Sequence, residues 1–432
     1  TNHAEVARAE ALGLDVIITD HHELPDGPPP EAFATINPKQ QGCEFPFKGL
    51  SGVGVAFNLV IALRARLRDL GYFADGGVRK EPNLSQYLDL VAVGTVADMV
   101  PLVDENRILV HLGLKVLAGA KRPGLKALME SAGVEPGAVD SGAIGFKIGP
   151  RINAAGRVAS ATIAYKLLVT DDAREAKVLA ERLETENLAR RELEARILAE
   201  AIEEVERTKM NENRAMVLSS ESWHPGVIGI VASRLVERYS RPVAMIAVDG
   251  DIGKGSVRSV KSVDVVGALG VCADLLTRFG GHRAAAGLTL EKGRIEEFRA
   301  AFTEHFNSTL TDDDLVGELN LDAGVELSAI DVAFATELGR LAPFGMGNKE
   351  PLLYVEGTTI ERTEILKDKH LRVQLSQNGY ERKAIAFNMA ALHPLEGEDY
   401  GVAFTTGLNE WRGRVSADIK IKGVRGGPNR GQ

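Results

Sequence analysis

Apolar and polar positions alternate in blocks along the N-terminal part of the chain. Residues 4–14 space their apolar side chains as an amphipathic helix does, and the β-branched run at residues 16–19 favours a buried strand. Helix-like and strand-like segments continue to alternate up to about residue 170, which is the rhythm of an α/β sheet. The pattern therefore predicts an α/β domain over residues 1–170 that is built on a parallel sheet.

Three more blocks follow, each with its own pattern. Residues 172–208 contain no Gly or Pro and repeat apolar residues at helical spacing, so a long connecting helix is predicted over residues 171–210. A strand, a turn and an apolar helix at residues 215–239 begin a second α/β domain, expected at residues 211–310. Short strands with turns then predict a small β-barrel of the OB-fold type at residues 317–425.

The composition narrows the class of protein. A length of 432 residues suggests two to four domains, and an apolar share of 44% is ordinary for a folded chain. No apolar run approaches the roughly 20 residues of a membrane span. Two cysteines, Cys43 and Cys272, argue against a disulfide framework or a cysteine-based zinc site and fit a reducing cytoplasm. With a net charge of −9, a nucleic-acid binder would have to concentrate its basic residues in a groove.

The stretch VIITDHH places Asp20, His21 and His22 directly after the predicted strand. Ligands of open α/β sheets bind beyond the carboxyl ends of the strands. Carboxylate and imidazole side chains together suit Mn²⁺, Mg²⁺ or Zn²⁺. The alternative is an ordinary strand-to-loop turn whose polar residues cap the backbone.

A second carboxylate follows an apolar run. Residues 88–96 are apolar and small, as in a buried helix or strand, and Asp98 comes next. A carboxylate in such surroundings is costly unless it is paired or binds a metal ion. A helix cap is the alternative, and residues 87–107 alone favour neither.

Basic residues lie among glycines and alanines at residues 143–158. Arg151, Asn153 and Arg157 belong to this segment. Small residues let the backbone approach a ligand, and arginine suits phosphate. The alternative is a loop with solvated arginines.

The second α/β domain carries three stretches typical of a phosphate-binding surface. A helix that starts after WHPG would expose backbone N–H groups, and the loops at residues 253–265 and 279–287 supply donors and close backbone access. The candidate residues are His224, Ser256, Arg258, Ser259, Gly280, Gly281 and His282. In the segment before the barrel, at residues 341–351, Phe344 is expected to be exposed, as in OB-folds that stack single strands.

These pieces, in their order along the chain, resemble one family. DHH, GTVADMVPL, RINAAGR, SWHPGVIGIVASRL, GKGSVRS and GGHRAAAG are similar to the motifs of the RecJ family, the bacterial single-strand-specific 5′→3′ DNA exonucleases of the DHH phosphoesterase superfamily. The resemblance covers nearly the whole chain. It implies a partial DHH domain with a parallel sheet, the long connecting helix, a second α/β domain of the DHHA1 type and a C-terminal OB-fold.

The resemblance also implies roles for the candidate residues. His21 and Asp98 would ligate one metal ion, Asp20 would either join them or orient His21, and His22 would face the scissile phosphate as a donor. Two ions, Mn²⁺ with Mg²⁺ as the alternative, would activate water and clamp the phosphate, releasing 5′-mononucleotides in DNA repair and recombination. Arg151, Asn153 and Arg157 would line the groove near the cleaved end. The seven candidates of the second α/β domain would hold the entering strand.

Two further family motifs precede TNHAE in such proteins and are not in this sequence. They carry aspartates of the two-metal cage, so the chain is expected to be processed or truncated and to hold half of that cage. We therefore expect it to bind single-stranded DNA yet degrade it very poorly, whereas a chain extended upstream would be active. A Mn²⁺-dependent nuclease assay on both forms would check this.

Two alternatives and several partners follow from the same resemblance. A phosphoesterase for oligoribonucleotides or cyclic dinucleotides is the first alternative, although residues 317–425 argue against it. A non-catalytic module that binds single-stranded DNA is the second, and metal-dependent degradation separates the two. The expected partners are single-stranded DNA, a single-strand-binding protein and a helicase, with no membrane and a monomeric chain.

Overall fold

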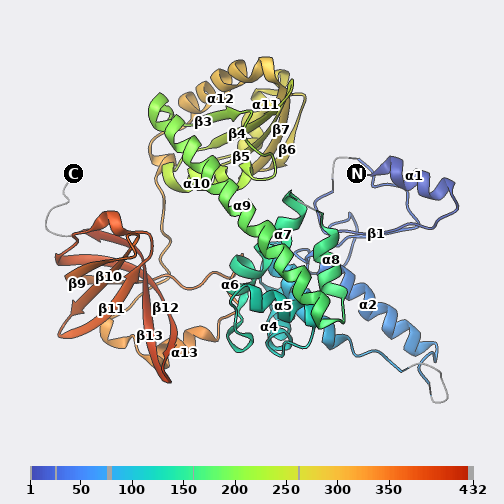
Figure 1. Ribbon diagram of the computed structural model, residues 1–432, viewed down its shortest axis with the longest axis horizontal. Coiled ribbons are helices and arrows are strands. Elements are labelled where there is room, and N and C mark those ends of the chain that lie inside the picture. Colours follow the sequence, from blue (N-terminus) through green and yellow to red (C-terminus); the bar gives the residue numbers. More distant parts are fainter. Residues whose placement is uncertain (1, 25–26, 75–79, 159, 261–262, 427–432) are drawn as a thin grey trace. The chain divides into compact units, whose positions relative to one another are not determined.

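The chain folds into two compact units, each described here by itself. A computed structural model describes residues 2–24, 27–74, 80–158, 160–260 and 263–426, without the side chains of residues 157 and 158 (Figure 1). The first unit comprises Thr1–Lys121, Gly133–Gly149 and Leu319–Gln432, and the second comprises Arg122–Ala132 and Pro150–Glu318. None of the helices in the described ranges is long and apolar enough to cross a membrane.

The first unit opens with the predicted helix and strand. Helix α1 (His3–Ala11) leads into β1 (Ile17–Thr19), which pairs in parallel with β2 (Ala34–Ile36). The expectation of a buried strand is wrong, because Ile17 is 56% exposed. Within the described residues β1 has β2 as its one neighbouring strand, so much of its surface stays open.

Three helices form the next layer of this unit and contain its core. They are α2 (Gly52–Asp69), α3 (Leu88–Ala97) and α4 (Asp104–Ala118). Helices α3 and α4 touch through their backbones, since an added Cβ at Gly113 would lie 2.2 Å from the carbonyl oxygen of Leu88. Val91, Ala92 and Val110 are buried in this contact. The run at residues 88–96 is therefore a buried helix, and Asp98 follows its end.

The glycine-rich segment at residues 143–158 is helical, so the alternative of a loop with solvated arginines does not describe its backbone. It forms α6 (Ser141–Ala143), a π-helical turn η3 (Ile144–Ile148) and α7 (Gly149–Val158). Asp140 caps its start by accepting a hydrogen bond from the backbone N–H of Ala143 (2.6 Å). Gly149 packs closely against α3, because a Cβ there would lie 3.4 Å from Cβ of Ala97. The glycine thus serves helix packing instead of a loop.

The second unit is built around the predicted long helix, α9 (Ala173–Thr208). Asp172 caps it by accepting a hydrogen bond from the backbone N–H of Arg174 (2.7 Å). Helices α5 (Pro123–Ser131) and α8 (Thr162–Val169) pack against α9.

A five-stranded sheet follows in the order β3-β4-β5-β7-β6. Strands β3 and β4 are parallel and the other neighbours are antiparallel. The strands are β3 (Met216–Ser220), β4 (Val243–Asp249), β5 (Ile252–Arg258), β6 (Arg278–His282) and β7 (Ala285–Glu291). The stretches at residues 253–265 and 279–287, predicted as loops, thus consist in large part of strands β5, β6 and β7.

Helices cover this sheet and complete two cores. Helix α10 (Ile228–Tyr239) begins after WHPG as predicted and shares a core with α9. Helices α11 (Val265–Val271) and α12 (Ile295–Thr309) contribute to the other core, in which Phe298, Phe302 and Phe306 are buried.

The C-terminal part of the chain is a closed five-stranded barrel, as the sequence predicts for an OB-fold. Its strands run in the order β10-β11-β13-β12-β9, and β9 also pairs with β10 to close the ring. The bounds are β8 (Ala323–Gly324), α13 (Val332–Gly339), β9 (Leu353–Leu366), β10 (His370–Gln377), β11 (Tyr380–Ala386), β12 (Gly397–Trp411) and β13 (Arg414–Gly426). Short 3-10 turns lie at Leu84–Tyr87 (η1), Pro136–Ala138 (η2), Met210–Glu212 (η4), Ala273–Leu275 (η5), Lys292–Arg294 (η6), Asp313–Leu315 (η7), Leu327–Ala329 (η8) and Ala390–Leu392 (η9).

The segment before the barrel is held by hydrogen bonds inside the first unit. The backbone N–H of Leu102 donates to the carbonyl oxygen of Met346 (2.6 Å). The hydroxyl of Ser141 donates to the backbone carbonyl oxygen of Phe344 (2.6 Å). Phe344 is half-buried and lines a pocket of about 230 Å³ with Leu338 of α13. The prediction of an exposed Phe344 is therefore wrong.

Candidate metal and phosphate sites

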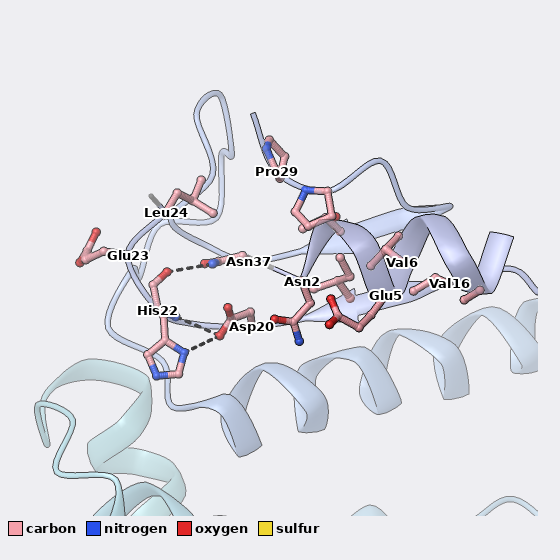
Figure 2. A pocket seen from close by; sticks show the side chains of 14 residues that line it. Asn2, Glu5, Val6, Val16, Asp20, His22, Glu23, Leu24, Pro29 and Asn37 are labelled. Atoms are coloured by element: carbon pink, nitrogen blue, oxygen red, sulfur yellow. Dashed lines mark hydrogen bonds and ion pairs between the residues drawn. The ribbon is translucent and has the colours of Figure 1, made fainter. Parts of the chain in front are cut away.

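The Asp-His-His stretch forms a tight turn directly after β1. The backbone N–H of Asp20 donates a hydrogen bond to the carbonyl oxygen of Ile36 at the end of β2 (3.0 Å). Oδ1 of Asp20 accepts from the backbone N–H groups of His21 (2.7 Å) and His22 (3.2 Å), and it lies 2.7 Å from Nδ1 of the His22 ring. Figure 2 shows the contact between Asp20 and the ring of His22. Asp20 thus orients the His22 ring, and not the His21 ring as one of its two predicted roles required.

These contacts keep the Asp20 carboxylate ionised. Partial burial opposes the charge, but hydrogen bonds from the His22 ring and from the backbone N–H groups of His22 and His21 outweigh it. The pKa of Asp20 is therefore lowered from its ordinary value of 3.8. At neutral pH this carboxylate therefore carries its full negative charge.

His21 meets Asp98, which comes from a distant part of the sequence. Nε2 of His21 lies 3.3 Å from Oδ2 of Asp98, so the predicted proximity of these side chains is confirmed. The His21 side chain is 15% exposed and rests on the start of α2, where an added Cβ at Gly52 would lie 3.4 Å from its Cδ2. Asp98 directly follows α3, and its side chain is 39% exposed. It faces an imidazole instead of capping a helix N-terminus.

The grouped side chains fit a divalent metal ion. One ligand atom each from Asp20, His21 and His22 lies within 4.8 Å of the others, and Asp98 adds a second carboxylate beside His21. Two carboxylates and two imidazoles form a mixed oxygen and nitrogen donor set that suits Mn²⁺ and tolerates Mg²⁺ less well.

Asn37 supports this turn and was missed by the sequence reasoning. It is 2% exposed, its Nδ2 donates to the carbonyl oxygen of His22 (3.0 Å), and its Oδ1 accepts from the backbone N–H of Lys39 (2.9 Å). A polar residue directly after the strand of TINPK was the signal that could have revealed it.

A cavity of about 580 Å³ lies beside Asp20, His22 and Asn37. Asn2 and Glu5 lie on its α1 side, and Val6 and Val16 add apolar surface (Figure 2). The cavity therefore joins an apolar wall to the ionised end of the turn.

The candidates of the RINAAGR motif lie in the second unit. Nε of Arg151 lies 2.5 Å from Oε2 of Glu184 on α9, and the Arg151 side chain is 11% exposed. The alternative of a solvated Arg151 is therefore wrong, and part of its charge is already neutralised. Asn153 is exposed on α7, and the side chain of Arg157 lies outside the described residues.

The structure brings Ser256 and Arg258 together against the start of α10. Nη1 of Arg258 donates to Oγ of Ser256 (2.9 Å). An added Cβ at Gly229, in the first turn of α10, would lie 2.9 Å from that Oγ and 3.0 Å from Nη2 of Arg258. His224 precedes the helix, is exposed, and accepts a hydrogen bond from the backbone N–H of Gly226 at Nδ1 (3.1 Å). Side-chain donors and a helix N-terminus thus meet at one place, which favours an anion.

The glycine candidates lie in the same sheet. Strand β7 lies between β5 and β6. Its residue Gly287 pairs with Ser256 of β5 and with Gly280 of β6, and its residue Ala285 pairs with Arg258 of β5 and with His282 of β6. The residues of β6 are exposed.

Gly281 and Ser259 have more structural roles. Gly281 has a φ of +148°, and an added Cβ would lie 2.5 Å from the carbonyl oxygen of Ala285, so glycine is required there. The Ser259 hydroxyl is buried, which removes it from the open surface that a DNA strand could reach.

Comparison with known protein families covers all three parts of the chain. Residues 1–95 match the DHH family N-terminal domain, residues 212–308 the DHHA1 domain, and residues 321–423 the RecJ OB domain. The single-stranded-DNA-specific exonuclease RecJ of Salmonella typhimurium is 40% identical over 98% of this chain and 75% of that protein. The chain belongs to the RecJ family.

Other RecJ proteins agree with this assignment. The single-stranded-DNA-specific exonuclease RecJ of Bacillus subtilis is 38% identical over 97% of this chain, which spans 52% of that longer protein. The crystal structure of RecJ from Thermus thermophilus in complex with Mn²⁺ has a TM-score of 0.83 and 32% identity, covering 99% of this chain and 60% of that one. A Mg²⁺ complex of the same protein matches with a TM-score of 0.74. The chain thus spans between about half and three quarters of the relatives it matches.

The barrel of this RecJ-family chain carries a feature that the sequence reasoning missed. Trp411 is 69% exposed at the end of β12, and the guanidinium of Arg412 lies 5.7 Å from its ring centroid. Arg414 is the cross-strand partner of Trp411. An aromatic residue between arginines at a predicted turn, in NEWRGRV, was the available signal.

Proposed function

We propose that the whole protein is a metal-dependent 5′→3′ exonuclease specific for single-stranded DNA, which releases 5′-mononucleotides during DNA repair and recombination. The observation that carries the proposal is the 3.3 Å approach of His21 and Asp98 beside the Asp20–His22 turn, in a chain that also contains an OB barrel. The names of the RecJ relatives support it.

The metal-binding roles follow from the geometry. His21 and Asp98 hold a divalent ion, Mn²⁺ or Mg²⁺, and Asp20 lies close enough to complete its shell or support it. The bound ion supplies Lewis-acid chemistry, which lowers the pKa of water and neutralises phosphate charge. The Thermus relatives solved with Mn²⁺ and with Mg²⁺ support this choice of metals.

His22 acts on the phosphate. Its Nδ1 contacts Asp20, so its other ring nitrogen is left to face a phosphate oxygen of the substrate, to which it donates a hydrogen bond when both ring nitrogens carry a proton. The carboxylate of Asp20 fixes this orientation of the ring.

The second unit holds the strand. Ser256 and Arg258 donate to a phosphate at the start of α10, with His224 and His282 as further donors, and the exposed glycine Gly280 gives the backbone of the strand close access. Arg151, Asn153 and Arg157 are proposed to contact phosphates of the strand as well. Trp411 of the barrel offers a surface on which a base can stack.

The predicted domain limits stay part of the proposal. They place the DHH portion at residues 1–170, the connecting helix at 171–210, the DHHA1 domain at 211–310 and the OB-fold at 317–425. The family matches at residues 1–95, 212–308 and 321–423 support this division. We further propose that the protein acts in the cytoplasm as a monomer, with a single-strand-binding protein and a helicase delivering its substrate.

The test is a degradation assay with Mn²⁺. The whole protein should release mononucleotides from 5′-phosphorylated single-stranded DNA and leave blunt duplex DNA intact. A preference for oligoribonucleotides or cyclic dinucleotides would contradict the proposal. So would tight binding of single-stranded DNA without metal-dependent degradation, which is the behaviour of a binding module.

A further inference from the structure

A buried hydroxyl pair lies beneath the His21–Asp98 pair. Oγ of Ser51 and Oγ1 of Thr95 are 2.8 Å apart, and both residues are 0% exposed. Ser51 also caps α2, because its Oγ accepts a hydrogen bond from the backbone N–H of Gly54 (3.1 Å). The pair therefore joins the start of α2 to the last turn of α3.

Ser51 lies next to the support of His21, and Thr95 lies close to Asp98 in the sequence. Ser51 precedes Gly52, on which the His21 ring rests. Thr95 belongs to the turn of α3 that ends at Asp98. The two helices are in close contact here, since an added Cβ at Gly94 would lie 2.7 Å from Cγ1 of Val53. A shift of α3 against α2 would therefore change the separation of His21 and Asp98.

Asn106 makes a second buried link between the same two segments. It is 0% exposed, and its Nδ2 donates to the carbonyl oxygens of Gly49 (2.7 Å) and Pro101 (2.9 Å). Gly49 shortly precedes Ser51, and Pro101 ends the turn that begins at Asp98. Met99 in that turn has a φ of +60°, a left-handed conformation that persists in a non-glycine residue only when its surroundings hold it.

Stability alone gives a weak reason for these polar groups. A buried pair of hydrogen-bonded hydroxyls can usually be replaced by apolar groups of the same shape with little net loss. Oδ1 of Asn106 is buried, and no hydrogen-bond partner for it lies in the described part of the chain, which is itself unfavourable. The three side chains instead fix the start of α2 relative to the end of α3 and the turn that follows it.

We propose that Ser51, Thr95 and Asn106 are positioning residues that hold His21 and Asp98 at the separation a shared divalent ion requires. The inference rests on the proposed metal-binding function. Residues that orient metal ligands from behind commonly change metal affinity by about 10- to 100-fold when they are replaced.

The test compares two substitutions at one position. Thr95→Val keeps the shape and removes the hydroxyl, whereas Thr95→Ser keeps the hydroxyl and removes a buried methyl group. Mn²⁺ affinity is measured by calorimetry on the whole protein, and thermal unfolding is measured without metal. We expect Thr95→Val to weaken Mn²⁺ binding about tenfold and Thr95→Ser to leave it within about twofold, although Thr95→Ser removes a buried methyl group and should itself lower the unfolding temperature.

A matched control and a second variant complete the design. Thr406 of the barrel is also buried and hydrogen-bonded, donating to the carbonyl oxygen of Asp418 (2.6 Å), and Thr406→Val should leave Mn²⁺ affinity unchanged. Asn106→Leu tests the second link and should weaken Mn²⁺ binding if it folds.

The outcomes separate the inference from the proposed function. If the unaltered chain binds Mn²⁺ and Thr95→Val binds it equally well, the positioning role is overturned. The same holds if affinity follows thermal stability, so that Thr95→Ser binds Mn²⁺ more weakly than Thr95→Val. If the unaltered chain binds no Mn²⁺, the proposed metal site itself fails, and the inference fails with it.

Discussion

The proposed metal site and the proposed phosphate surface of this chain are assembled in different ways. His21 and Asp98 come from segments far apart in the sequence and meet only because α2 and α3 pack closely. Ser256 and Arg258 share one strand, and their neighbours are fixed by the register of β5, β7 and β6. The first site therefore depends on helix packing, whereas the second depends on strand pairing and on glycines that leave room for side chains.

This difference predicts that the two sites can be damaged separately. His21→Ala should reduce metal-dependent degradation of single-stranded DNA by the whole protein about 100-fold, because a metal ligand and its contact with Asp98 are lost. Binding of single-stranded DNA should change less than about twofold, since Ser256 and Arg258 belong to another unit. A parallel loss of degradation and binding would show that the sites are not separate.

The barrel provides a third contact that acts by stacking. Trp411→Ala should weaken binding of single-stranded DNA by about 1–3 kcal/mol, the usual effect of losing one base–aromatic stack. The salt dependence of binding should stay the same, because no cation is removed. Tyr380→Ala, at another exposed aromatic residue of the barrel that is 51% exposed, is the control and should have little effect.

The phosphate surface acts by charge, which gives a different signature. Arg258→Ala should weaken binding of single-stranded DNA several-fold and reduce the slope of the log–log salt dependence by roughly 0.7. Titrations between low and moderate salt would measure this. An unchanged slope with unchanged affinity would mean that Arg258 contacts no phosphate. Mn²⁺ affinity should not respond to this change.

The smallest effect concerns the pH dependence of stability. The pKa of Asp20 is lowered in the folded chain, so its contacts stabilise the fold while the carboxylate is ionised. The stability difference between the unaltered chain and Asp20→Asn should shrink as the pH falls below about 4, where Asp20 becomes protonated. Because the side chain of Asp20 is 42% exposed, the difference should be below about 1 kcal/mol. Urea unfolding across this range would measure it, and a difference that grows on acidification would contradict the assigned shift.

Local patterns in the sequence predicted much of the fold. Helix α9 was predicted because it lacks Gly and Pro, α10 because it follows WHPG, and the barrel because of its short strands. The proximity of His21 and Asp98 was predicted from the motifs they belong to and is confirmed.

The errors lie where distant packing decides the structure. Gly255 was predicted to lie in a loop but lies in β5. Glycine is needed there because an added Cβ would lie 2.6 Å from the side chain of Leu288 on β7. Gly149 likewise serves contact with α3. The exposure of Ile17 and the partial burial of Phe344 also depend on neighbours that a local pattern does not contain. The exposed Trp411 was not predicted, because its segment was used only as evidence for a β-barrel.

The central claim is that His21 and Asp98 hold one divalent ion, and Mn²⁺ affinity of Asp98→Asn tests it most directly. This substitution keeps the size of the side chain and removes its charge. Calorimetry on the full chain should show Mn²⁺ binding at least tenfold weaker than in the unaltered chain, with thermal stability in the absence of metal little changed. Equal Mn²⁺ affinity in the two chains would show that Asp98 is not a ligand and would contradict the account.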